Sequence, residues 1–180
     1  MNSRRMRMRA TTVEDAPLLI TWYKQKELLK HVGFDEGLCL TLEKQTHIIM
    51  NQKGDEKLMM LTLLDDTPIG ECHFKNIRGA SCEIGLKIGD LNYQGQGYGK
   101  EGLHMLLAHL FGVLGMKIVF LDVLESNERA RHLYKKVGFK ETSIRQNAWT
   151  DSKGEARAIV YMTLTLDDFK MALNVPFPIV

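Results

Sequence analysis

A glycine-rich turn followed at once by an amphipathic helix is the feature that most constrains how this chain can fold. The turn reads Gln94-Gly95-Gln96-Gly97-Tyr98-Gly99. Alternating glycines leave backbone N–H groups uncovered and permit the positive φ angles that a tight phosphate-binding turn often needs. A helix that follows adds its unpaired first-turn N–H groups and the positive end of its dipole. The pattern therefore predicts an anion site where these six residues, the glycine loop, meet the helix.

The helix after the glycine loop has a clear apolar stripe. We expect it to begin at about Lys100, and its apolar residues recur at the helical spacing of three and four positions. They are Leu103, Leu106, Leu107, Leu110, Phe111 and Leu114. Core packing accounts for these side chains, so the sequence assigns any function to the N-terminus of the helix.

The spacing of the glycines separates this loop from two other phosphate-binding loops. A P-loop has four residues between its first glycine and its Gly-Lys pair, whereas three residues separate Gly95 from Gly99. A dinucleotide fingerprint has a third glycine where this chain has Lys100. Gln94, Gly97 and Gly99 fit the pattern Gln-x-x-Gly-x-Gly, which resembles the pyrophosphate-binding loop of the GNAT superfamily of N-acetyltransferases. For this motif alone, an ordinary glycine-rich turn before a helix is the alternative.

A second motif, about thirty residues further on, resembles the other signature of the same superfamily. Asn127 is followed by Ala130, then by Leu133-Tyr134 and then by Gly138-Phe139. An apolar helix and an apolar strand are predicted between the two motifs, as in the family. Two motifs in the family's order extend the resemblance over most of the chain, from about Met6 to Leu166.

Within the superfamily, one branch shows the stronger resemblance. Segment Ala80–Glu101 resembles the branch that includes the ribosomal-protein Nα-acetyltransferases and the spermidine acetyltransferases. So does Ile144–Gln146, which is followed by a turn at Ser152–Gly154 and a strand that ends at Tyr161-Met162. The aminoglycoside acetyltransferases are a related branch.

The predicted elements mix hairpins with crossovers, which implies an α/β (α+β mixed) fold with helices on both faces of a mixed sheet. The resemblance makes this a GNAT-like fold, with a central, twisted, mostly antiparallel sheet of six or seven strands. Residues 1–180 are expected to form one domain, with a core over about 6–166 and a C-terminal tail over 167–180. The main strands expected from periodicity and turn signals are Met6–Ala10, Leu58–Leu64, Ile69–Lys75, Ser81–Ile88, Lys117–Leu124, a strand from Phe139, and Ala156–Leu166.

Composition places the chain among folded proteins without a strong charge bias. Its 180 residues are 44% apolar, which suits a domain with a sizeable core. The net charge of +2 gives no argument for nucleic acid as a partner. Four arginines near the start are interpreted as a solvated terminus that runs into an edge strand, with a polyanion contact as the alternative. They are Arg4, Arg5, Arg7 and Arg9.

Cysteine usage and hydropathy indicate the compartment. Cys39, Cys72 and Cys82 have neither metal-ligand nor disulfide spacing, and their apolar settings indicate reduced, mostly buried thiols in a cytoplasmic protein. The sequence shows no signal peptide and no apolar run long enough for a membrane span. No metal site and no membrane partner are therefore expected.

The resemblance implies that acetyl-coenzyme A is the cosubstrate. In the family, the strand before the glycine loop separates from the strand after the helix, and the pantetheine arm pairs with the exposed backbone, here Leu86, Lys87 and Ile88. The glycine loop, above all the N–H groups of Gln96–Gly99, would bind the pyrophosphate together with the Gln94 side chain. Lys100 would add a salt-sensitive contact unless it is simply a solvated lysine. Asn127 either bonds the arm or serves only as a helix cap.

Acetyl transfer to an amine also needs a base and an acid. An amine with a pKa near ~10.4 is protonated at neutral pH and must lose that proton before it attacks. Glu83 and Glu71 are the candidate bases, since each lies on a predicted strand between apolar neighbours; a solvent-facing strand residue is the alternative for both. His73 shares the face of Glu71. Tyr134 matches the family's usual acid, whose phenol suits protonation of a departing thiolate; a core tyrosine is the alternative.

The resemblance therefore implies an N-acetyltransferase in which a primary amine attacks acetyl-coenzyme A directly within a ternary complex. The acceptor is a polyamine, an aminoglycoside-like small molecule or a protein N-terminus. Asp35, Glu36 and Glu43 lie in the segment expected to line the acceptor side and could attract a cationic amine. The alternative is a non-catalytic acyl-coenzyme A-binding regulatory module. A homodimer is a further expectation from the family.

Overall fold

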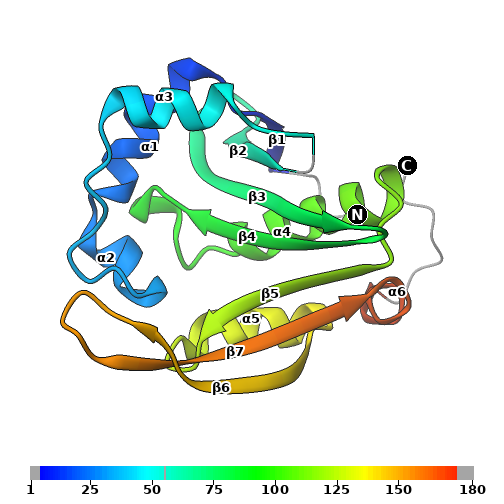
Figure 1. Cartoon of the computed structure of the whole chain (residues 1–180). Helices are drawn as coiled ribbons and strands as arrows, with labels where there is room; N and C mark the ends of the chain where they lie inside the picture. Colours follow the sequence, from blue (N-terminus) through cyan, green and yellow to red (C-terminus); the bar gives the residue numbers. More distant parts are fainter. Residues whose placement is uncertain (1–4, 55, 174–180) are drawn as a thin grey trace.

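One seven-stranded sheet organises the structure (Figure 1). The computed structural model describes residues 5–54 and 56–173, apart from the side chain of Val32. The strand order is β1-β2-β3-β4-β5-β7-β6; β4 and β5 pair in parallel, and the other neighbouring strands pair antiparallel. The predicted mixed, mostly antiparallel sheet is confirmed. The strands are β1 (Met6–Ala10), β2 (Lys57–Leu63), β3 (Pro68–Arg78), β4 (Ser81–Ile88), β5 (Ile118–Leu124), β6 (Lys140–Thr150) and β7 (Ala156–Thr165).

Helices cover both faces of the sheet, as predicted. Met60 packs among α1–α3, whereas its neighbour Leu61 packs among α4–α6. Successive residues of a strand point to opposite faces, so these two helix groups lie on opposite sides. The helices are α1 (Ala16–Tyr23), α2 (Lys26–Leu29), α3 (Leu42–Met50), α4 (Tyr98–Ala108), α5 (Glu128–Val137) and α6 (Leu166–Leu173), with a 3₁₀ turn, η2, at Lys30–Val32.

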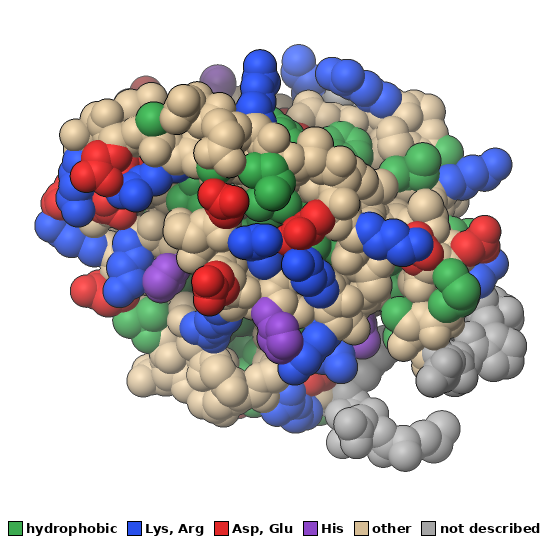
Figure 2. Space-filling model, turned by 90° about the horizontal axis from the view of Figure 1, so that it is seen from below, with side chains coloured by type: hydrophobic (Ala, Val, Ile, Leu, Met, Phe, Trp, Pro, Cys, Tyr) green, Lys and Arg blue, Asp and Glu red, His purple; other side chains and the backbone are tan. Residues whose placement is uncertain are grey.

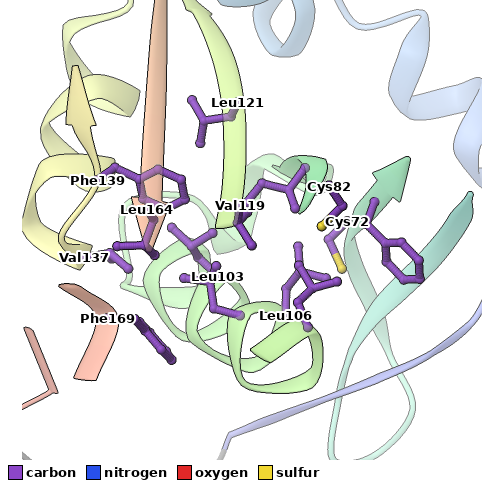
Figure 3. Close-up of a cluster of buried hydrophobic side chains, with 14 of the residues drawn as sticks. Cys72, Cys82, Leu103, Leu106, Val119, Leu121, Val137, Phe139, Leu164 and Phe169 are labelled. Atoms are coloured by element: carbon purple, nitrogen blue, oxygen red, sulfur yellow. The ribbon is translucent and has the colours of Figure 1, made fainter. Parts of the chain in front are cut away.

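The main core lies between the sheet and α4–α6 (Figure 3). Alternate residues of β4 enter it, including Cys82 and Ile84, so the residues between them, including Glu83, face the side of α1–α3. The leucines of α4 are fully buried, which confirms most of the predicted apolar stripe; they are Leu103, Leu106 and Leu107, with Leu110 just beyond the helix. Leu114 is the exception, because a π-helical turn at His109–Val113 ends the regular spacing and leaves Leu114 exposed.

Two boundaries differ from the predictions. Helix α4 begins at Tyr98 rather than Lys100, because Gly97 takes a left-handed conformation and caps it. The segment from Asp167, predicted as the start of a tail, forms the rest of α6, and Phe169 is buried in the main core. The core therefore extends past residue 166, whereas residues 174–180 of the predicted tail lie outside the described residues.

The two ends of α5 follow the sequence closely. The Asn127 Oδ1 accepts a hydrogen bond from the Ala130 N–H at 3.1 Å, and Gly138, with φ of +108°, ends the helix. The helix runs over Glu128–Val137 because a side-chain cap begins it and a left-handed glycine terminates it. Helix α5 therefore holds Tyr134 on the face of the sheet that carries the main core.

In the described part of the chain, 5–54 and 56–173, no helix is both long enough and apolar enough to cross a membrane.

Candidate active site

β4 and β5 pair at one end and separate at the other. Ser81, Cys82 and Glu83 pair with residues 118–120, but over residues 84–88 and 121–124, all of them described, the two strands share no ladder. Figure 1 shows them close at one end and apart at the other, where α2 lies. This separation, the strand opening, leaves one edge of Leu86–Ile88 without a partner strand, as the family resemblance predicts.

The glycine loop lies at the same end of β4 and presents its backbone. Gly95 and Gly97 have φ angles of +75° and +87°, so these positions require glycine. Within the described part of the chain, no hydrogen bond is found from the N–H groups of residues 95–99. Because the last two of these begin α4, their free N–H groups coincide with the positive end of the helix dipole. The arrangement suits a phosphate.

The Gln94 side chain holds the loop against β4. Its Nε2 donates to the Ile88 carbonyl at 2.9 Å, and its Oε1 accepts from Arg129 at 3.5 Å. Asn127 is likewise engaged, since its Nδ2 donates to the His31 carbonyl at 2.9 Å while its Oδ1 caps α5. Gln94 therefore bonds within the protein and Asn127 forms the helix cap that was one of its two predicted roles, whereas Lys100 is exposed.

Arg5 is a part of this region that the sequence did not indicate. Its guanidinium lies 4.2 Å from the centre of the Tyr98 ring, donates to the Gln96 carbonyl at 3.2 Å and pairs with Glu101 at 3.0 Å. Arg5 is exposed, as predicted for the solvated terminus, but it also contacts the glycine loop. Since the chain separates it from the loop by about ninety residues, no local pattern could have revealed the contact.

Tyr134 lies on α5, with its ring 5.6 Å from that of Phe139. Burial, with a smaller contribution from the negative charge of Asp122, raises the pKa of Tyr134 to about 12. The phenol therefore stays protonated at neutral pH and is able to donate a proton. Asp122, whose charge acts on Tyr134, belongs to β5, the strand that forms one side of the opening.

Glu83 lies where β4 and β5 begin to separate. Its carboxylate accepts from the Asn76 Nδ2 at 2.7 Å and pairs with the Lys75 Nζ at 3.1 Å. Asp122, two residues beyond Glu83's ladder partner Phe120, shares this face. Burial and the charge of Glu83 raise the pKa of Asp122. The sequence signal that would have found Asp122 is a lone carboxylate in an apolar strand.

Glu71 is buried and fully engaged. It accepts a hydrogen bond from the Tyr23 hydroxyl at 2.5 Å and pairs with the Lys87 Nζ at 2.7 Å. Burial alone would raise the pKa of Glu71, but the charge and hydrogen bond of Lys87 and the bond from Tyr23 outweigh it, so that the pKa lies below its usual value. The carboxylate therefore stays ionised and its two oxygens hold the neighbouring side chains in place.

A hollow of about 300 Å³, the α3 cavity, lies between the sheet and α1–α3. Its floor is formed by the side chains of β3 and β4 that face away from the main core. The His73 ring lies against Gly85, where a Cβ would come within 2.4 Å of the ring, so glycine at this position makes room for the ring. Floor residues are Glu71, His73, Lys75 and Lys87.

The segment after α2 closes one side of the α3 cavity and is held by the β6–β7 hairpin. Phe34 lines the cavity and packs edge-on against Trp149 at 5.3 Å between ring centres. Asp35 pairs with Lys153 at 3.3 Å. The cavity wall therefore depends on residues more than a hundred positions apart.

The surface charges are mixed. On the face seen in Figure 2, lysine and arginine side chains lie among acidic ones. Arg7 and Arg9 pair with Asp66 and Asp15 at 3.0 Å and 2.7 Å, while Arg4 lies outside the described residues. These features differ from the continuous basic stripe typical of nucleic-acid binding. Among the residues that the structure describes, no group of three or more His, Cys, Asp or Glu could hold a metal ion.

Comparison with known proteins decides the family. The profile of the acetyltransferase (GNAT) domain matches residues 5–140, which is more than half of the chain. The chain belongs to the GNAT acetyltransferase family. The predicted class of enzyme, an acetyl-coenzyme A-dependent N-acetyltransferase, is thereby confirmed.

Both kinds of enzyme that the sequence analysis placed in one branch occur among the similar proteins. The ribosomal protein bS18-alanine N-acetyltransferase of Haemophilus influenzae is 30% identical over 132 residues, which are 69% of this chain and 88% of the relative. The enzyme of the same name from Haemophilus ducreyi is 36% identical over 139 residues, 73% of this chain and 94% of the relative. Spermidine N-acetyltransferase from Vibrio cholerae, solved with CoA and spermine, has a TM-score of 0.84 at 16% identity, covering 93% of this chain and 99% of that chain. This last likeness shows the fold.

Proposed function

We propose that this GNAT enzyme binds acetyl-coenzyme A along the strand opening and transfers the acetyl group directly to a primary amine. The observation that carries the proposal is the free edge of Leu86–Ile88 next to five consecutive N–H groups without a partner in the described part of the chain. An extended arm with a pyrophosphate at one end matches these two features. Arg129 lies at the loop through its contact with Gln94, and Arg5 lies there as well, paired with Glu101; the cation at Arg129 supports an anionic ligand.

In the proposed reaction the amine nitrogen attacks the thioester carbonyl carbon, a C–N bond forms and the C–S bond breaks. Glu83 accepts the proton that the amine loses, directly or through water. Tyr134 donates a proton to the departing thiolate, so that coenzyme A leaves as a thiol. A backbone N–H on the free edge of Leu86–Ile88 stabilises the oxyanion.

Of the two carboxylates that the sequence offers as bases, we propose Glu83. Glu71 already accepts from Tyr23 and Lys87 and is nearly inaccessible, which supports a role in holding the floor of the α3 cavity. Burial and the charge of Glu83 raise the pKa of Asp122, a second carboxylate on the face that carries Glu83.

The relatives suggest the acceptor class but differ among themselves. Two are named for an alanine of a ribosomal protein, and one structural neighbour for spermidine. A protein N-terminus, a polyamine and an aminoglycoside-like amine all present the primary amine that the reaction needs.

We further propose one domain, a cytoplasmic location and a homodimer. The three cysteines are free, with Cys72 and Cys82 buried, which agrees with a reducing compartment. β6 is an edge strand with Lys140–Asn147 exposed, which offers a surface for a second copy. Light scattering of the purified protein tests the dimer.

The test of the activity is release of free thiol from acetyl-coenzyme A in the presence of spermidine, an aminoglycoside and N-terminal peptides. Turnover with any of them, together with the acetylated amine by mass spectrometry, establishes the reaction. Tight coenzyme binding by calorimetry without turnover would instead favour a non-catalytic acyl-coenzyme A-binding module. Absence of both binding and turnover would contradict the proposal.

A further inference from the structure

Arg5 bonds to both the glycine loop and the first turn of α4. Its backbone N–H donates to the Glu101 Oε1 at 2.8 Å, and its Nε donates to the Oε2 of the same carboxylate at 3.0 Å. Its guanidinium also donates to the Gln96 carbonyl at 3.2 Å and lies 4.2 Å from the centre of the Tyr98 ring. The residue that precedes β1 is thereby attached to both parts of the proposed pyrophosphate site.

The groups on either side of Arg5 are fixed in place. Met6, the next residue, is fully buried in the main core, so the backbone of Arg5 is anchored there. The Tyr98 ring packs against that core and lies edge-on to the Tyr93 ring at 5.7 Å between ring centres. An exposed ion pair usually contributes little, because two long side chains lose freedom when they form it. Here the backbone N–H and the fixed ring reduce that loss, although the Arg5 side chain is 46% exposed.

The bond to Gln96 determines where the next N–H points. The peptide between Gln96 and Gly97 is planar and trans, so its C=O and N–H point in opposite directions. Since the C=O points to Arg5, the Gly97 N–H points away from it, and within the described part of the chain this N–H has no partner. Glycine permits this peptide to rotate, which would turn the carbonyl oxygen toward the proposed anion site. The bond from the guanidinium opposes that rotation.

Glu101 places a negative charge in the first turn of α4. A carboxylate there is stabilised by the helix dipole, but it also repels a phosphate bound at the same helix end. Arg5 pairs with this carboxylate through both its backbone N–H and its Nε, which offsets the negative charge. The positive end of the helix dipole therefore remains available to an anion.

We infer that Arg5 is a positioning residue for the pyrophosphate of acetyl-coenzyme A. It orients the Gly97 N–H toward the ligand through the Gln96 carbonyl, and it offsets the charge of Glu101 at the helix end that receives the phosphates. This inference rests on the proposed function, since it concerns how the glycine loop binds the coenzyme.

The first test is calorimetry of acetyl-coenzyme A binding to the wild type and to Arg5→Gln. The substitution removes the charge and the guanidinium bonds, and it is expected to weaken binding about tenfold, the effect of about one net hydrogen bond. With an amine that the wild type acetylates, KM for acetyl-coenzyme A should rise by the same factor, while kcat stays within about twofold. Arg7→Gln makes the same change two residues later, where the side chain pairs with Asp66, and this matched control should leave the affinity unchanged.

A second test separates positioning from a role in folding alone. Adding Glu101→Gln to Arg5→Gln removes the carboxylate that Arg5 no longer offsets, so the double variant should bind acetyl-coenzyme A about threefold more tightly than Arg5→Gln. If the pair only held β1 on α4, loss of the second partner would leave the affinity the same or lower. In the ligand-free protein, the Gly97 amide resonance should broaden in Arg5→Gln and not in Arg7→Gln, because only the former releases the peptide.

The results bear on the inference and on the proposed function separately. Arg5→Gln with wild-type affinity, an equal loss in Arg7→Gln, or a double variant that binds no better than Arg5→Gln overturns the inference. Binding and turnover of acetyl-coenzyme A by the wild type would then keep the proposed function intact. A wild type that does not bind acetyl-coenzyme A removes the proposed function and the inference together.

Discussion

The strand opening and the α3 cavity lie beside the same strand, β4, yet they are built in different ways. The strand opening takes its glycine loop, its free β4 edge and α5 from two compact motifs, residues 80–101 and 127–139. The α3 cavity takes its wall and floor from α1, α2, α3, β2, β3 and β4, and the β6–β7 hairpin holds its rim. The part that we propose binds the cosubstrate comes from segments that are close in the sequence, whereas the part that we propose lies on the acceptor side comes from distant segments.

This difference has a physical basis. A pyrophosphate is bound mainly by backbone N–H groups, which need glycines and a helix start in sequence but no particular partner side chains. An acceptor is recognised by side-chain shape and charge, which many combinations of residues supply. Substitutions on the donor side should therefore act on coenzyme affinity or on chemistry, and substitutions on the acceptor side on substrate choice or stability.

Tyr134→Phe should have the largest effect. The ring keeps its packing against Phe139 while the proton donor is lost, so kcat is expected to fall by about 10²-fold or more. Steady-state kinetics at saturating acetyl-coenzyme A measure this, with thermal unfolding as the control for folding. Unchanged kcat would show that the thiolate obtains its proton elsewhere.

Substitution of glutamate by glutamine should lower catalytic efficiency at position 83 and stability at position 71. Glu83→Gln is expected to lower kcat/KM by about 10²-fold with little change in stability. Glu71→Gln breaks a buried pair with Lys87 and should lower the free energy of unfolding by about 3 kcal/mol. Denaturant unfolding and kinetics on both variants distinguish the roles, and a Glu71→Gln protein with full stability and no activity would reverse the assignment.

Gly97→Ala tests the donor side, and Gly115→Ala, beyond the far end of α4, is its matched control. Both glycines have positive φ angles, +87° and +67°, and neither has a close neighbour that a methyl group would strike. Backbone strain should cost each variant a similar stability, about 1 kcal/mol. Only Gly97→Ala should weaken acetyl-coenzyme A binding, about tenfold by calorimetry, because only Gly97 lies in the glycine loop. Equal affinities in the two variants would remove the loop from the donor site.

Substitution of His73 should have the smallest effect. This effect is a change in how the stability of the protein depends on pH. Burial lowers the pKa of His73 to about 4, from about 6.5 in the unfolded chain. Between these values the unfolded state binds the extra proton, so stability falls as the pH decreases from 6.5 toward 4. From pH 7 to pH 5.5 the wild type should lose about 1 kcal/mol more than His73→Gln. Parallel curves for the two proteins would show that His73 is accessible to water and protons.

Local signals predicted much of the fold and most of the donor side. The bounds of β4 agree with the prediction, and the ends of α5 are marked by the motif residues Asn127 and Gly138. The C-terminal helix α6 was missed, although Leu166, Phe169 and Leu173 have helical spacing, because the two aspartates before Phe169 read as the start of a polar tail.

Contacts between distant residues could not be predicted in the same way. Arg5 on the glycine loop, the Tyr23 hydroxyl on Glu71 and the buried Gln45 all belong to residue types that are usually exposed or serve many roles. Their positions follow from how β1, α1 and α3 pack onto the sheet, and that packing is decided by the whole apolar pattern rather than by any neighbouring residue.

The most direct test follows the backbone amide resonances of the whole protein during titration with acetyl-coenzyme A, then with an acceptor amine in the presence of coenzyme A. The account predicts that acetyl-coenzyme A shifts the amides of residues 86–88 and 95–99, and that His73, in the floor of the α3 cavity, responds chiefly to the amine. Saturable coenzyme binding that leaves residues 95–99 unchanged, or that acts first on the α3 cavity, would contradict the division of the site into these two halves.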